Sequence, residues 1–191
     1  MTRIALLLLL SVAVATAAPP PKSAAASVVF VVDRGLAKHA AAFGDAVVVL
    51  DRGDLVSLVA YDQFEVILRD VIAAQRGLIR EEAANMKPGI GTDIRPALVA
   101  AWTLLADAKG AKHVIVVSAS TITRDGYADT AKRLHEAKIT VTAIGAPGSN
   151  RDQLAALTGK QGRIYMIDDA RFLANILATE LRRIRPPRDA R

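Results

Sequence analysis

The run from Val28 to Val32 (VVFVV) constrains the fold of this chain more than any other stretch, because five consecutive β-branched or aromatic residues leave no polar face. Such a run is typical of a strand that is buried on both sides at the centre of a parallel sheet. Asp33, Arg34 and Gly35 follow it, so we expect these residues just beyond the carboxyl end of the strand. In open α/β sheets, ligands bind at that edge.

Further apolar runs alternate with amphipathic segments along the rest of the chain. Strands are predicted at 55–60, 65–68, 113–117, 139–144 and 164–167, and helices at 36–50, 71–86, 94–108, 126–138 and 170–184, with a short helix ending at 157 and capped by Asn150 or Asp152. Such alternation implies right-handed crossovers. We therefore expect a doubly wound, Rossmann-like, mostly parallel α/β domain over residues 27–184, with helices on both faces of the sheet.

Residues 1–18 are predicted to be a signal peptide rather than part of the fold. Arg3 gives a positive start, Ile4–Val14 supplies an apolar core, and Ala15–Ala17 fits a small-x-small pattern, so cleavage after Ala17 is preferred. An uncleaved membrane anchor is the alternative, although a spanning helix needs roughly 20 apolar residues. Residues 19–26 form a linker. We expect an exported protein, either periplasmic or extracellular.

The composition excludes several classes of function. The 191 residues include no cysteine, so disulfides, thiolate metal sites and cysteine nucleophiles are excluded. The formal net charge is +6, which permits contact with anionic surfaces. Four Phe, three Tyr and one Trp offer few platforms on which bases could stack. We therefore expect no specific binding of nucleic acid.

No stretch of the sequence carries a catalytic motif. The segment Ser118–Ser120 lacks the glycines of a nucleophile elbow. Gly89 and Gly91 follow a predicted helix and lack a third glycine, so a dinucleotide site is not supported, and no phosphate-binding P-loop is present. We predict that the chain is not an enzyme; a hydrolase or nucleotide-binding protein on the same fold is a lesser hypothesis.

The histidines and the single tryptophan are assigned structural places. Trp102 lies within an amphipathic pattern and is expected in the core. The histidines have no spacing that suggests metal ligation, and we expect them to be solvated or to lie at edges: His39, His113 and His135.

Four short segments carry a family resemblance: the turn Gly53–Val56, the strand end Val59–Asp62, the loop Pro88–Ile94 (PGIGTDI) and the strand and turn Ile164–Asp169. They resemble the corresponding segments of a von Willebrand factor type A domain, in particular those of bacterial membrane proteins. The resemblance covers nearly all of the mature chain. It implies a bacterial protein with a doubly wound fold that binds another protein.

In that family, the carboxyl edge of the sheet holds a metal-ion-dependent adhesion site formed by an Asp-x-Ser-x-Ser loop, a Thr and a further Asp. Mg²⁺ needs near-octahedral oxygen coordination. Asp33 and Thr92 match the first Asp and the Thr, whereas Gly35 and Ala37 stand in place of both serines and Ala119 in place of the last Asp. The resemblance thus implies a degenerate site. We expect no cofactor, and Mg²⁺ at the two remnant positions is the alternative.

The expected binding face consists of Asp33, Gly35, Gly91, Thr92, Ser118 and Ser120. Without a metal, Asp33 is expected to accept hydrogen bonds from the first amides of the next helix, or to be neutralised by Arg34 or Arg124. Thr92 or Asp93 is expected to cap the helix at 94–108. We predict metal-independent contact with another protein through this face.

Arginines crowd the carboxyl-terminal end of the chain: Arg182, Arg183, Arg185, Arg188 and Arg191. A basic tail of this kind can hold a membrane surface or another polyanion, at about 1 kcal/mol per basic residue near anionic lipid. Polyanion or membrane-surface binding through residues 185–191 is therefore the alternative function, and a solvated, frayed terminus is the simpler interpretation.

Overall fold

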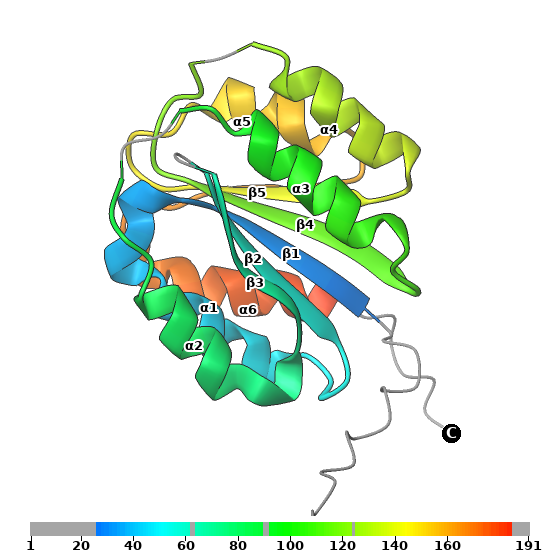
Figure 1. Cartoon of the computed structure of the whole chain (residues 1–191). Helices are drawn as coiled ribbons and strands as arrows, with labels where there is room; N and C mark the ends of the chain where they lie inside the picture. Colours follow the sequence, from blue (N-terminus) through cyan, green and yellow to red (C-terminus); the bar gives the residue numbers. More distant parts are fainter. Residues whose placement is uncertain (1–25, 62–63, 90–91, 124, 185–191) are drawn as a thin grey trace, which may run out of the picture.

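A six-stranded sheet forms the middle of three layers, with helices on both faces (Figure 1). The computed structural model describes residues 26–61, 64–89, 92–123 and 125–184. The strand order is β3-β2-β1-β4-β5-β6, with β1 (Ala26–Asp33), β2 (Leu55–Tyr61), β3 (Glu65–Ile72), β4 (Ala111–Ser118), β5 (Thr140–Gly145) and β6 (Ile164–Met166). All neighbouring strands are parallel except β2 and β3. The predicted doubly wound, mostly parallel α/β fold is confirmed.

The helices divide into two sets of three. They are α1 (Ala41–Ala46), α2 (Arg76–Ala84), α3 (Arg95–Ala106), α4 (Tyr127–Glu136), α5 (Arg151–Thr158) and α6 (Leu173–Ile184), with 3₁₀ turns at Arg34–His39, Val47–Val49, Ala73–Gln75 and Ala170–Phe172. Figure 1 shows α1, α2 and α6 on one face of the sheet and α3, α4 and α5 on the other. Each set closes a separate apolar core against the sheet.

Strand β1 lies at the centre of both cores, as its sequence predicts. All eight of its residues are buried. Val28, Phe30 and Val32 face the core beneath α1, α2 and α6, while Val29 and Val31 face the other core. Because successive side chains of a strand alternate between its faces, only a continuous apolar run can fill both cores.

Two of the predicted helices were wrong in part. The segment 36–50 is not one helix but a 3₁₀ turn, α1 and a second 3₁₀ turn, because the β-branched residues Val47–Val49 do not favour a continued α-helix. The helix predicted from residue 71 begins only at Arg76. Val71 and Ile72 instead pair with Val56 and Leu55 of β2, so β3 is longer than predicted. The whole of β3 runs antiparallel to β2.

The prediction for Trp102 was wrong, and of the two places expected for His113 it has the strand edge but not the solvated surface. Trp102 is 44% exposed, because the buried stripe of α3 consists of Ala97, Leu98, Ala101 and Leu105 and turns Trp102 outward. His113 is buried rather than solvated, since α6 covers the start of β4. The cap of α5 was predicted correctly: the Asn150 side chain accepts hydrogen bonds from the first backbone amides of the helix.

Helices α1 and α2 approach each other closely at Gly44. A Cβ atom at this position would lie 2.3 Å from the Cβ and 2.5 Å from the Cα of Arg80, so it would collide with the backbone of α2. We expect Gly44→Ala to lower the free energy of unfolding by about 2 kcal/mol, because the two helices must move apart. Urea unfolding measures this loss. Gly77→Ala is the control, because the structure leaves open space there; an equal loss in both variants would contradict the prediction.

The predicted signal peptide, residues 19–25 of the linker and the basic tail at 185–191 lie outside the described residues. Among the residues that are described, no helix combines the length and the apolar character that crossing a membrane requires.

Candidate functional site

The carboxylate of Asp33 is the centre of a hydrogen-bonded cluster at the carboxyl edge of the sheet. Asp33 ends β1 and is 1% exposed. Its Oδ1 accepts a hydrogen bond from the Gly35 amide at 2.8 Å, which caps the following 3₁₀ turn. Its Oδ2 accepts from the Ala119 amide at 3.0 Å and from the Ser120 hydroxyl at 2.6 Å. The expectation that Asp33 accepts hydrogen bonds from the first amides of the next helix is confirmed for one amide, that of Gly35, in a 3₁₀ turn.

Tyr61 completes this cluster from the end of β2. Its hydroxyl lies 2.8 Å from Ser118 Oγ and 3.2 Å from Asp33 Oδ2, so both oxygens are within reach of the single phenol proton. The Ser118 hydroxyl in turn donates to the Ser120 carbonyl at 2.9 Å. Burial, and then the Asp33 carboxylate, raise the pKa of the Tyr61 phenol well above its ordinary value. Tyr61 therefore stays a neutral donor beside a buried carboxylate.

Sequence reasoning missed Tyr61, although a signal for it exists. Tyr61 pairs in register with Asp33, and both residues follow an apolar run at the end of a strand. Parallel strands that end at one level bring their last side chains together. The tyrosine at the end of β2 was thus a candidate for the same cluster as the aspartate at the end of β1.

Gly35 and Ala37 lie where serine would fit poorly. Gly35 is exposed, but a Cβ atom there would lie 3.1 Å from Asp33 Oδ1, tighter than ordinary van der Waals contact. Ala37 is buried within the apolar core beneath α1, where a serine hydroxyl would meet mostly hydrocarbon. The packing around β1 is therefore adapted to the small residues that the chain carries.

Thr92 lies beside the loop that follows β4. Its hydroxyl is hydrogen-bonded to the hydroxyl of Thr123, and its carbonyl accepts from the Thr123 amide at 3.3 Å. Asp93, rather than Thr92, holds the first amide of α3, because its Oδ1 accepts from the Arg95 amide at 3.2 Å. The loops after β1 and before α3 therefore both attach to residues 118–123, as the sequence predicts for this edge.

The remaining predicted residues of this edge fall in different places. Gly91 and Arg124 lie outside the described residues. Arg34, proposed as a cation that neutralises Asp33, instead forms an ion pair with Glu65 and donates to the Lys87 carbonyl at 3.1 Å. Ser118 is fully buried and Ser120 half-buried, so Ser118 supports the edge from within. Of the predicted binding face, Gly35, Thr92 and Ser120 reach the surface.

A shallow cavity of about 330 Å³ adjoins the cluster on the side of β5 and β6. Gly35, Lys38, Ala119, Pro147 and Asp168 contribute to its lining. The backbone between β5 and α5 is fixed to the cluster, since the Ala146 amide donates to the Ser118 carbonyl at 2.7 Å. This edge thus offers a concave, mixed-charge surface on a rigid base.

Comparisons with known proteins find proteins of similar structure but none of similar sequence. No family model and no curated protein matches the chain. Among solved structures, von Willebrand factor type A from Catenulispora acidiphila superposes with a TM-score of 0.73 at 19% identity, over 85% of this chain and 43% of that chain. Proximal thread matrix protein 1 from the mussel byssus superposes with a TM-score of 0.71 at 16% identity, over 84% of this chain and 46% of that chain. That structure is described as having a zinc-occupied MIDAS motif, the abbreviation for a metal-ion-dependent adhesion site.

A third similar structure is the vWF domain of the type V pili tip protein Mfa5 from Porphyromonas gingivalis, with a TM-score of 0.65 at 13% identity, over 87% of this chain and 98% of that chain. At such identities, the likeness is one of fold. The chain spans less than half the length of the Catenulispora and mussel structures.

Proposed function

We propose that this chain, which has the fold of a von Willebrand factor A domain, is an exported module that binds another protein without catalysis and without a metal ion. The observation that supports this most is the state of Asp33. Both of its carboxylate oxygens accept hydrogen bonds from protein donors in a site that is closed to solvent. The donors of the protein thus take the place that a cation occupies in a metal-dependent site.

The chemistry of the donor set also disfavours Mg²⁺. A hard cation requires about six oxygen ligands, usually with one or two carboxylates. Among the positions that match the family's ligands, Asp33 is the only carboxylate, because Ala119 stands in place of the second. Gly35 and Ala37 also lack the hydroxyls of the two serines, and both oxygens of Asp33 already accept hydrogen bonds from protein donors. The residues around Asp33 therefore do not fit a Mg²⁺ site.

The surface that would meet a partner consists of exposed parts of the same edge. Gly35, Thr92 and Ser120 reach solvent, and Thr121 and Pro147 extend the surface around the cavity beside them. Asp33 and Ser118 are buried, so in this proposal they hold the loops in place rather than touch the partner. No catalytic role follows from this arrangement.

Thermal unfolding with chelator, Mg²⁺, Mn²⁺ or Ca²⁺ tests metal independence. We expect no change in Tm for the native chain. The test is sensitive, because a cation that bound only the folded state would raise the free energy of unfolding by about 2.7 kcal/mol at 100 times its Kd. Ala119→Asp is the positive control. It places a second carboxylate beside Asp33 and should be less stable in chelator by about 2 kcal/mol and recover with Mg²⁺. A rise in Tm of the native chain with any cation would contradict the proposal.

The partner-binding surface is tested by photo-crosslinking. A crosslinking residue at position 121, at the proposed face, should capture a defined partner from the exported fraction of the source cell, and one at position 132, on exposed α4, should not. The Thr121→Arg variant should lose the partner in a pull-down, while Lys132→Glu keeps it. Equal capture from both positions would place the interface elsewhere.

Binding of an anionic surface through the basic tail is the second candidate. Arg182 and Arg183 are exposed at the end of α6, immediately before the tail, which favours it. Binding by charge alone weakens steeply as salt rises, whereas a packed protein interface changes little. Vesicle binding at two ionic strengths, with and without residues 185–191, therefore separates the two functions.

A further inference from the structure

A basic cavity lies at the amino-terminal edge of the sheet, opposite the Asp33 cluster. It has a volume of about 340 Å³ and opens between the starts of β4 and β5, the segment before β6 and the end of α6. Its charged lining residues are Lys112, Lys138, Arg163, Arg183 and Glu180. Four cations and one carboxylate therefore share one concave surface among the described residues, and such a concavity concentrates positive potential.

The single carboxylate of this cavity is already satisfied from within the protein. Glu180 is fully buried, and its oxygens accept hydrogen bonds from the hydroxyls of Thr142 and Tyr165, each at 2.8 Å. Arg163 lies 3.4 Å from Glu180 Oε1 and supplies the opposite charge. His113, at the base, adds no charge at neutral pH, because burial lowers its pKa to about 4. The charge of Glu180 thus does not neutralise the remaining cations.

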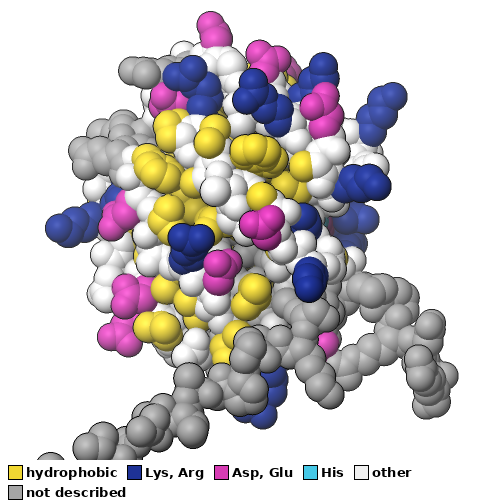
Figure 2. Space-filling view, turned by 45° about the vertical axis from the view of Figure 1, so that its right-hand side comes forward, with side chains coloured by type: hydrophobic (Ala, Val, Ile, Leu, Met, Phe, Trp, Pro, Cys, Tyr) yellow, Lys and Arg dark blue, Asp and Glu magenta, His cyan; other side chains and the backbone are white. Residues whose placement is uncertain are grey.

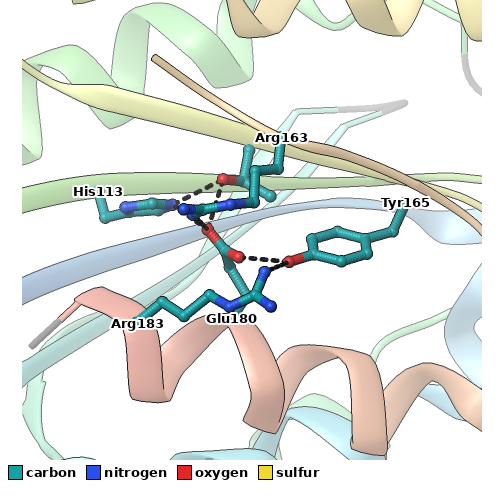
Figure 3. A network of polar contacts seen from close by, with 6 residues as sticks. His113, Arg163, Tyr165, Glu180 and Arg183 are labelled. Carbon is teal, nitrogen blue, oxygen red and sulfur yellow. Dashed lines mark hydrogen bonds and ion pairs between the residues drawn. The ribbon is translucent and has the colours of Figure 1, made fainter.

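The same network fixes the positions of two guanidinium groups. Figure 3 shows Arg163 and Arg183 on either side of Glu180, with the Tyr165 hydroxyl between Glu180 and Arg183. Arg183 donates to that hydroxyl at 2.6 Å, a neutral acceptor that leaves the charge of Arg183 uncompensated. Within the described residues, Arg183 forms no ion pair with a carboxylate. Two guanidinium groups are therefore held at the same cavity before any ligand arrives.

Lys138 brings a third cation to the cavity in an unfavourable backbone conformation. Its φ is +59°, in the left-handed region where a side chain costs roughly 1–2 kcal/mol and glycine costs little. Its amide donates to the His135 carbonyl and closes the end of α4. The chain carries a lysine where glycine would relieve this strain, and that lysine lines the cavity.

We propose that this cavity binds a phosphate group. Two preset guanidinium groups and an ammonium group suit a tetrahedral, multiply charged anion, because guanidinium pairs with phosphate oxygens through two parallel hydrogen bonds. The volume admits a phosphate monoester or the headgroup phosphate of a lipid. The site lies at the opposite edge from the proposed protein-binding face, and it does not depend on that function.

Titration of the full chain with inorganic phosphate, against chloride at matched ionic strength, tests the site. We expect saturable binding that Arg183→Gln weakens about tenfold and Lys138→Gln several-fold. Arg182→Gln and Lys132→Gln are the matched controls, because each removes one exposed charge outside the cavity, and they should change the affinity less than about twofold. The Tm of each variant, measured without phosphate, shows that the fold is retained.

A second arm distinguishes the source of the phosphate. If the site takes a lipid phosphate, binding to vesicles of phosphatidylglycerol and phosphatidylcholine falls in Arg183→Gln, persists in Arg182→Gln and is competed by inorganic phosphate. If it takes a soluble phosphate, saturable binding appears in solution and vesicle binding is the same in both variants. The proposal is overturned if phosphate binds no better than chloride and Arg183→Gln and Arg182→Gln reduce vesicle binding equally.

Discussion

Asp33→Ala is expected to lower the free energy of unfolding by about 3–5 kcal/mol, the largest effect of any single substitution at the carboxyl edge. The variant removes a buried acceptor and leaves the amides of Gly35 and Ala119 and the hydroxyls of Tyr61 and Ser120 without their charged partner. Buried donors that lose an acceptor carry their full desolvation penalty. Urea unfolding at pH 7 measures the loss.

The cation dependence of this loss separates the structural role of Asp33 from ligation of a metal. We expect the same loss in chelator and in millimolar Mg²⁺, because the partners of Asp33 are protein groups. Asp125→Ala, which removes an exposed carboxylate near the same edge, should change stability by less than about 0.5 kcal/mol. A loss for Asp33→Ala that is below 1 kcal/mol, or that appears only with Mg²⁺, would contradict this account.

The contribution of His113 to the free energy of unfolding is expected to fall by about 3 kcal/mol as pH decreases from 6.5 to 4. Burial, partly opposed by Glu180 and reinforced by Arg163, lowers the pKa of His113 from 6.5 to about 4 in the folded chain. Between these values the unfolded chain gains a proton that the folded chain does not bind. This contribution to stability is therefore complete above pH 6.5, is lost as pH falls toward 4, and changes no further below 4.

His113→Gln isolates this contribution. The Thr142 hydroxyl donates to Glu180, so its oxygen accepts from His113 Nε2, a position that a glutamine amide can reach. We expect the free energy of unfolding to depend less on pH in His113→Gln than in the native chain. Urea unfolding at several pH values measures both profiles. The difference between the profile of the native chain and that of His113→Gln removes the contribution of carboxylates that titrate in the same range. Equal dependences for His113→Gln and the native chain would refute the assignment.

Local chemistry was sufficient to predict the core of the fold. The run in β1 admits only a doubly buried strand, and the cap at Asn150 follows from a side-chain acceptor next to free helix amides. The helix expected from residue 71 begins later than predicted, because Val71 and Ile72 are β-branched and pair with β2. The prediction for Trp102 was wrong because the buried stripe of α3 consists of alanines and leucines, which turn Trp102 toward solvent.

The two charged clusters show what depends on tertiary contact. Asp33, Ser118 and Ser120 were predicted to meet at one edge, because parallel strands end there, but the donor geometry that closes the carboxylate also needs Tyr61 from β2. At the opposite edge, Glu180 meets His113 and Tyr165 only because α6 packs across the sheet. Those residues are separated along the chain, and no local pattern links them.

The sequence by itself determined the fold class, the central strand and the edge where polar loops meet, since these follow from hydrophobic periodicity and from short-range hydrogen bonding. Only the tertiary structure decided which charges are buried, which are compensated and which remain available to a ligand. The free energy of a charged group depends on distances of a few ångströms and on exclusion of water. Packing between distant segments sets both quantities, for Asp33 and for the cations around Glu180 alike.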